Sequence, residues 1–180
     1  MTSKHKLINN ISGWIVFAIS ATVYLLTIEP TASFWDCGEF ISSAYKLEVG
    51  HPPGAPFFML VGNFFTQFAR DTSQVAMMVN IMSALMSAFT ILFLFWTITH
   101  LTSKLIIKDK GDAPSLAKTI VIIASGAVGA LVYTFSDTFW FSAVEGEVYA
   151  FSSMLTALVF WLILKWEDNA HKAHSDKWLV

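Results

Sequence analysis

Four long apolar stretches separated by polar segments dominate the chain. They cover residues 11–28, 75–101, 119–135 and 148–164. Each holds about 17 residues or more, the least that an α-helix needs to cross the hydrocarbon core of a bilayer. The pattern therefore predicts an all-α integral membrane protein with about four transmembrane helices.

Two shorter helices are predicted in the loop 30–74, between the first and second apolar stretches. The helix over 54–69 has phenylalanines on one side and polar residues on the other, which favours lying at the membrane interface over crossing it. The helix over 37–48 is expected to have two faces. Its polar stripe holds Glu39, Ser42, Ser43 and Lys46, opposite Phe40, Ile41, Ala44 and Leu47. A second polar loop covers 136–147.

Composition supports the membrane class. Of the 180 residues 55% are hydrophobic and 13% charged, where a soluble domain carries about a quarter charged residues. Mean hydropathy is +0.59. The net charge of -2 and the lack of a basic cluster argue against a nucleic-acid partner. The single cysteine excludes an internal disulfide and a multi-cysteine metal site.

Lysines cluster in two places, at the N-terminus and in the segment 104–118. Cytoplasmic loops of membrane proteins carry an excess of lysine and arginine, so both segments are predicted to be cytoplasmic. The loops 30–74 and 136–147 are then external to a cell (inner) membrane. A cleaved signal peptide is the competing interpretation of the N-terminus, but its apolar core is usually shorter than 11–28.

Asp36 supports two hypotheses. With Glu39 it has the spacing of a helix N-cap and its capping-box partner, which needs no catalysis. Alternatively, Asp36 lies beside Trp35 next to a membrane span and is placed to act as a general base toward an acceptor hydroxyl.

Several other polar residues also have a structural and a functional interpretation. His51 precedes Pro52-Pro53-Gly54 and is either exposed at a turn or a substrate ligand. Glu145 and Glu147 are solvated, or cap the next helix, or share one site, but two ligands are too few to predict a bound metal. Asn80 is expected to form a structural hydrogen bond more readily than to bind a ligand, and Cys37 to be a small buried residue.

These motifs together resemble the glycosyltransferase-C superfamily. The closer resemblance is to a family of bacterial membrane proteins, catalogued as a domain of unknown function, that is related to the animal transmembrane protein O-mannosyltransferases. The shared pattern comprises Ser33–Phe40, Gly50–Pro56, Val79-Asn80 with Ser83–Leu85, Phe139-Trp140 and Glu147–Ala150. The His51–Gly54 stretch also looks like that of protein O-mannosyltransferases. Relatives often carry arginine where this chain has Met78.

The resemblance implies transfer of a sugar, with mannose expected, from a polyprenyl-phosphate carrier to a Ser or Thr hydroxyl of an acceptor protein. It implies membrane lipid as a partner, no certain cofactor beyond the lipid-linked donor, and a divalent ion only as an option. Asp36 would be the catalytic base. The substrate-binding residues would be Trp35, Glu39, His51, Asn80 and Glu147. A complete enzyme of this kind needs about seven spans, so the chain is expected to be the N-terminal part of a longer one.

A different class remains open, a non-catalytic membrane scaffold or envelope/export component whose external loops bind a partner. A transporter fits less well, because the predicted spans carry almost no ionisable groups. The lysine distribution puts both acidic loops on one face, and the second loop, 136–147, is expected to pack over the start of the helix at Asp36. Asp36 and Glu147 are therefore expected around one cavity, roofed by Trp35, Phe139 and Trp140, with few balancing positive charges.

Overall fold

The computed structural model describes residues 3–107, 114–172 and 174–179. Every regular element in these ranges is a helix. Four of the helices are long and apolar enough to cross a membrane, which confirms the expected all-α membrane fold. The basic loop expected between the second and third spans lies partly outside the described residues, at 108–113.

The four long helices are α1 (Ser3–Leu26), α4 (Val75–Ile106), α5 (Leu116–Thr134) and α7 (Val148–Asn169). Three of them run well past the expected apolar ranges, because polar residues such as Lys4 continue the helical hydrogen-bond ladder as readily as apolar ones. At its other end α1 stops two residues earlier than expected. Pro30 follows closely there, and a residue before proline disfavours the helical conformation.

The shorter elements are α2 (Cys37–Lys46), α3 (Pro56–Thr66) and α6 (Asp137–Ala143), with 3-10 turns η1 (Thr72–Gln74) and η2 (Ser175–Trp178). Helix α6 was not expected, because seven residues are too few for a periodic pattern. Helix α3 begins at a proline, which suits the first helical position because its missing N–H needs no partner there.

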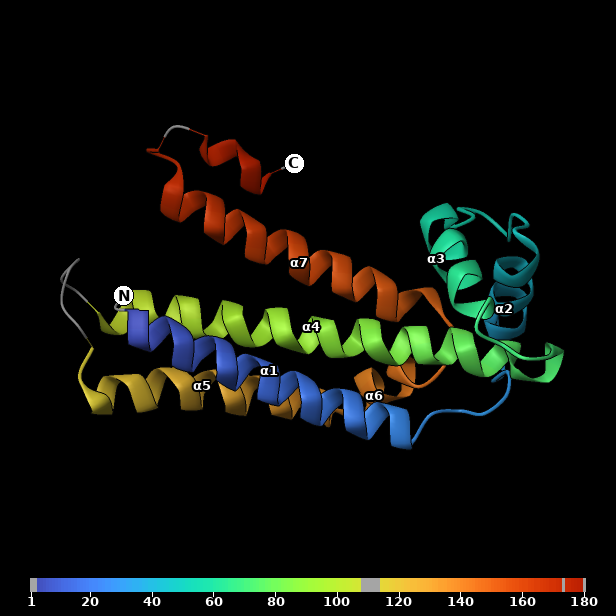
Figure 1. The fold of residues 1–180 in the computed structure, drawn as a ribbon, viewed down its shortest axis with the longest axis horizontal. Coiled ribbons are helices and arrows are strands. Elements are labelled where there is room, and N and C mark those ends of the chain that lie inside the picture. The colour runs from blue at the N-terminus through green and yellow to red at the C-terminus, as the bar shows by residue number, and fades with distance from the viewer. Residues whose placement is uncertain (1–2, 108–113, 173, 180) are drawn as a thin grey trace.

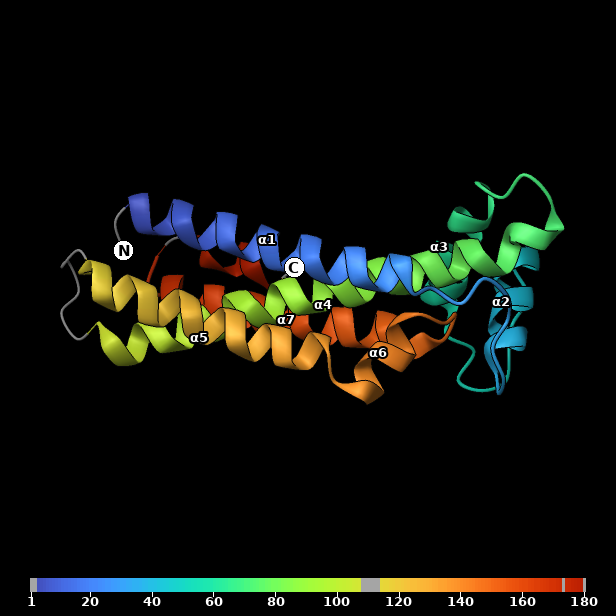
Figure 2. The ribbon, with the colours of Figure 1, turned by 90° about the horizontal axis from the view of Figure 1, so that it is seen from below.

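Helix α4 is the centre of the bundle and packs against α1, α5 and α7. Figures 1 and 2 show the four long helices running side by side, with α2, α3 and α6 gathered at one end. The start of α1, the end of α4 and the start of α5 lie at the other end. The two acidic loops therefore share one end of the bundle.

Small residues let the helices approach closely, as expected for packing in lipid. A Cβ added at Gly126 of α5 would lie 2.4 Å from Cγ2 of Thr99 on α4. Hydrogen bonds from hydroxyl groups also join α1 and α5. Tyr24 Oη donates to Thr134 O at 3.0 Å. Ser20 Oγ and Thr134 Oγ1 are 3.1 Å apart.

Helix α3 is attached to α2 by its polar side. Asn63 Nδ2 donates to the backbone oxygens of Ala44 and Tyr45, each at 3.0 Å, while Phe57, Phe64 and Phe68 are exposed. With eleven residues, α3 is about 17 Å long and too short to cross a bilayer.

The expected division of α2 into a polar and an apolar face is wrong at two positions. Ser43 is buried, and Leu47 is exposed in the left-handed conformation that ends the helix. Both differ because the packing of α2 on α3 and α4, and not the helical period alone, decides which side is covered.

Candidate functional site

Three consecutive residues at the start of α2 differ in their backbone conformation and exposure to solvent. Trp35 has φ 63°, a left-handed conformation that is unusual for a bulky residue, and its side chain is 89% exposed. Asp36 is exposed, and Cys37 is fully buried. The turn at Trp35 thus directs an indole and a carboxylate outward and anchors the next residue in the core.

Asp36 does not cap α2 with its side chain, although the helix begins directly after it. The capping-box interpretation of Asp36 and Glu39 is therefore wrong in its hydrogen bonds. Glu39 Oε1 accepts from the backbone N–H of His51 at 2.6 Å, and its Oε2 lies 3.1 Å from His51 Nδ1. These bonds from His51 lower the pKa of Glu39. The Asp36 carboxylate remains available to another partner.

The second acidic loop comes close to both α2 and α4. Glu145, Gly146 and Glu147 are all buried. A Cβ at Gly146 would lie 2.9 Å from Asn80 Oδ1 and 3.1 Å from Ile41 Cγ1, so only glycine lets the backbone come this near. That approach carries two carboxylates to the side of α2.

Asn80 supports the loop that leads to Asp36. Its Nδ2 donates to the backbone oxygens of Glu29 at 2.7 Å and Thr31 at 2.9 Å. The side chain is fully buried in α4. The structural hydrogen bond expected from the sequence is confirmed. Asn80 does not line the pocket described next, and its assignment as a substrate contact stays a prediction.

Asp36 and Glu147 line one pocket of about 230 Å³. The full lining is Trp35, Asp36, Phe141, Ser142, Glu145, Glu147 and Tyr149. We call it the acidic pocket. Its aromatic members were only partly foreseen: Phe139 is instead buried against Tyr24 and Tyr133, and Trp140 Nε1 donates to Thr27 Oγ1. The helical turn of α6 places Phe139 and Trp140 on the side that faces α1, away from the acidic pocket.

Burial shifts the pKa values of two residues at or beside the acidic pocket, Glu145 and Cys37. Burial raises the pKa of Glu145, and the neighbouring Glu147 adds to the shift, while a hydrogen bond from Ser33 opposes it. Burial, together with the charges of Glu145 and Glu147, raises the pKa of Cys37 as well. Within the described part of the chain neither Glu145 nor Glu147 forms a salt bridge.

Cys37, Glu145 and Glu147 each place a ligand atom within 4.8 Å of the others. A thiol and two carboxylates can bind a divalent cation after the thiol loses its proton. Geometry alone does not make this cluster a metal centre, because the raised pKa of Cys37 keeps it protonated and Cys37 Sγ already donates to Glu147 Oε1 at 3.4 Å.

His51 and Glu39 form a separate pair outside the acidic pocket. Their side chains are 46% and 41% exposed, and neither lines the acidic pocket. Of the six expected site residues, three are therefore brought together, namely Trp35, Asp36 and Glu147. The pocket adds Glu145, which the sequence suggested only through its spacing from Glu147.

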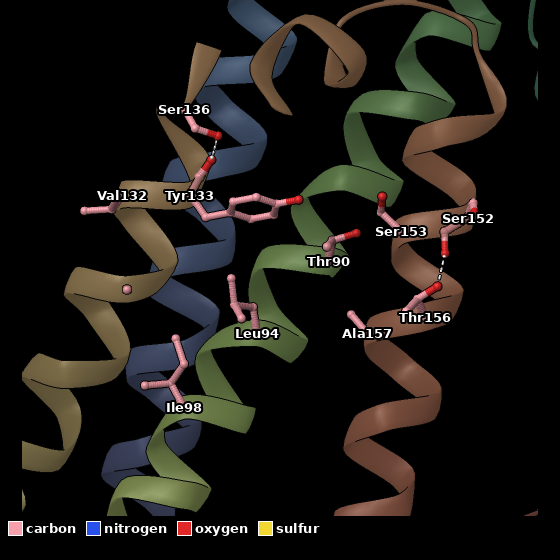
Figure 3. A pocket seen from close by; sticks show the side chains of 11 residues that line it. Thr90, Leu94, Ile98, Val132, Tyr133, Ser136, Ser152, Ser153, Thr156 and Ala157 are labelled. Atoms are coloured by element: carbon pink, nitrogen blue, oxygen red, sulfur yellow. Dashed lines mark hydrogen bonds between the residues drawn. The ribbon is translucent and has the colours of Figure 1, made fainter. Parts of the chain in front are cut away.

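A larger groove lies in the membrane-spanning region between α5 and α7, with α4 as its floor (Figure 3). Its volume is about 640 Å³, and its lining is Thr90, Leu94, Ile98, Gly129, Val132, Tyr133, Ser136, Ser152, Ser153, Thr156 and Ala157. Three of its hydroxyls donate to nearby backbone oxygens, Thr90 to Met86 O, Ser136 to Tyr133 O and Thr156 to Ser152 O. The sequence signal was the run of small and hydroxyl residues on α7.

The structure is that of a polytopic helical membrane protein. It has an acidic pocket at one end of the bundle and a groove between its helices. Residues 36–180 match the family described as "Protein O-mannosyl-transferase TMEM260 N-terminal domain". The chain belongs to this family.

Two relatives illustrate the similarity. The chain is 29% identical over 163 residues to "Protein O-mannosyl-transferase TMEM260" of Mus musculus, covering 90% of this chain and 20% of the relative. It is 27% identical over 149 residues to "Protein O-mannosyl-transferase tmem260" of Dictyostelium discoideum, covering 82% of this chain and 16% of the relative. The chain thus spans a fifth or less of these curated relatives. No solved structure matches.

Proposed function

We propose that this chain is the N-terminal membrane part of a glycosyltransferase-C enzyme that transfers mannose from a polyprenyl-phosphate carrier to a Ser or Thr hydroxyl of a protein. The observation that carries the proposal is the convergence of Asp36, Glu145 and Glu147 on one pocket at the end of an apolar bundle. The names of the relatives support O-mannosyl transfer to protein as the reaction.

Asp36 is the proposed general base. Its carboxylate is exposed and does not cap the helix. It can therefore take the proton of an acceptor hydroxyl as the hydroxyl oxygen bonds to the anomeric carbon of the sugar, while the bond from that carbon to the phosphate oxygen breaks and polyprenyl phosphate leaves. Asn80 and Cys37 act indirectly, because they hold the two loops that line the pocket. The exposed indole of Trp35 offers an apolar face beside the base.

Glu145 and Glu147 are proposed to meet the donor. Because its pKa is raised, Glu145 can hold a proton and donate a hydrogen bond to a phosphate or sugar oxygen. Glu147 is proposed to accept hydrogen bonds from sugar hydroxyls or to bind a cation that accompanies the phosphate. Glu39 and His51 brace the first loop from outside the pocket.

The groove between α5 and α7 is proposed to receive the polyprenyl chain. Tyr149 lines the acidic pocket, and Ser153, four residues later, lines the groove. Residues four apart lie on the same face of a helix, so α7 connects the two. A carrier lying in the groove can therefore present its phosphate at the acidic pocket. In this arrangement the acidic loops are external and the N-terminus cytoplasmic, as the lysine distribution predicts.

Asp36→Asn in the full-length protein tests the proposal. An amide cannot accept the proton, so the rate of mannose transfer from polyprenyl-phosphate mannose is expected to fall by roughly 10²–10⁴-fold. The matched control is Asp71→Asn. Asp71 lies in the same loop, accepts from Ser73 N and does not line the pocket, and asparagine replaces aspartate well as a cap.

Near-normal transfer by Asp36→Asn, with protein levels equal to wild type, would remove Asp36 as the base. Absence of any transfer by the wild-type protein would favour the scaffold alternative instead.

A further inference from the structure

A second polar pocket lies at the end of the bundle away from the acidic loops, where α1, α4 and α7 meet. Its volume is about 220 Å³, and its lining is Lys6, Asn9, Asn10, Trp96, Thr99, His100, Trp161 and Lys165. We call it the lysine pocket. In Figure 1 this is the end marked by the start of α1. The proposed glycosyl transfer makes no use of it.

The lysine pocket carries positive charge without an internal counter-charge. Among the described residues that line it, two are lysines and none is acidic. The nearby carboxylates of α7 do not line the pocket: Glu167 and Asp168 both pair with Lys104, and Asp168 Oδ2 also lies 3.6 Å from Nδ1 of His100 in the lining. Within the described ranges Lys6 and Lys165 form no salt bridge.

Neutral polar groups complete the lysine pocket. Asn9 and Asn10 bring side-chain amides from α1. His100 Nε2 is shielded from solvent and has no hydrogen-bond partner among the described residues, and a ring N–H at this position can donate to an anion. The Lys165 ammonium lies 5.0 Å from the centre of the Trp161 ring, a cation–π contact that holds it beside the pocket. Ammonium and amide donors converging in this way suit a phosphate group.

An aromatic strip runs from the lysine pocket toward the middle of the bundle. Phe89, Phe93, Trp96 and His100 follow one face of α4 at spacings of four, three and four residues, over about 16 Å. Trp161 of α7 continues the strip, with its ring centre 5.3 Å from that of Trp96 and 5.7 Å from that of Phe93. The three aromatic residues of α4 and Trp161 are all partly exposed. The strip thus joins a polar pocket to an apolar surface.

We propose that the lysine pocket and the aromatic strip form a binding site for an anionic phospholipid. The headgroup phosphate lies between Lys6 and Lys165, and an acyl chain follows the strip along α4. Basic pockets between transmembrane helices bind anionic headgroups. The strip favours a lipid over a free phosphate ion, because only a lipid uses both parts. The proposal is independent of the enzymatic one.

A titration followed by native mass spectrometry tests the site on the full-length protein in detergent. The probes are phosphatidylglycerol and phosphatidylcholine with identical acyl chains. Phosphatidylglycerol is expected to bind more tightly. The double variant Lys6→Gln with Lys165→Gln is expected to weaken its binding by about tenfold to thirtyfold, since each lysine contributes a factor of roughly five.

Two control variants make the result specific. Lys118→Gln with Lys177→Gln removes the same charge from lysines outside the pocket and is expected to change binding by less than about twofold. Lys6→Arg with Lys165→Arg keeps the charge and is expected to retain the lipid, which separates loss of the site from misfolding.

Three outcomes would overturn the proposal. The first is equal binding of the two lipids, and the second is equal weakening by the pocket and control double variants. The third is displacement of phosphatidylglycerol by excess inorganic phosphate, which would show a phosphate site that does not use the aromatic strip.

Discussion

The thiol of Cys37 donates a hydrogen bond to Oε1 of Glu147 across 3.4 Å, between residues 110 positions apart in the chain. Cys37 begins α2 in the first loop, and Glu147 directly precedes α7 after the second loop. Both side chains are buried. This bond therefore joins the loop that carries Asp36 to the loop that carries the other two carboxylates of the acidic pocket.

Removal of that donor is expected to destabilise the acidic end of the bundle. Cys37→Val keeps an apolar side chain of similar size but leaves a buried carboxylate oxygen without its donor, at a cost of about 1–3 kcal/mol. Cys37→Ser keeps a donor at the same position and is the matched control. Thermal unfolding in detergent should give a lower Tm for the valine variant than for the serine variant. Equal Tm values would mean that the bond contributes nothing.

Glu145→Gln is expected to raise stability at neutral pH. Burial raises the pKa of Glu145 in the folded protein, so the folded state favours the protonated form. Its contribution is fully present below the pKa of the unfolded chain and is lost as the pH rises through the raised folded pKa. Glutamine imitates the protonated acid, and we expect Tm to rise by about 2–4 °C, or roughly 1 kcal/mol.

The same variant should flatten the dependence of Tm on pH across that window. Glu48→Gln, at an exposed position of the first loop, is its control. A lower Tm for Glu145→Gln at neutral pH would show that the ionised carboxylate has a partner that stabilises it.

Filling the groove between α5 and α7 is expected to impair use of the lipid-linked donor. Thr156→Phe projects a ring into the groove, whereas Val159→Phe, on an exposed part of α7 outside the lining, does not. We expect kcat/KM for the polyprenyl-phosphate donor to fall by about tenfold or more for the first variant only. Steady-state kinetics with the donor varied would measure it. An equal loss in both variants would indicate a packing defect.

The orientation of the acidic loops can be tested with single cysteines. In a Cys37→Ser background, cysteines replacing Ser33 and Asp71 lie on either side of α3 in sequence. Because α3 packs on α2 at one end of the bundle, both positions should react with an impermeant thiol reagent in intact cells. Labelling of Ser33→Cys with protection of Asp71→Cys would mean that α3 crosses the membrane, contrary to the proposed topology.

The fold class could be predicted from the sequence because its signals are local. A run of about 17 or more apolar residues must satisfy its backbone hydrogen bonds as a helix in lipid. Pro30 and Pro56 mark where α1 must have ended and where α3 begins. The prediction that Asp36 and Glu147 belong to one site also came from local motifs, and both residues line the acidic pocket.

The acidic pocket itself was decided by tertiary packing. Glu39 could bond to its own helix end or to His51, twelve residues away, and the fold of the first loop brought His51 within reach. Glu145 joined the pocket because Gly146 fits closely beneath Asn80. Helical period and hydropathy describe one segment at a time, whereas the partner of a polar side chain depends on which other segment packs beside it.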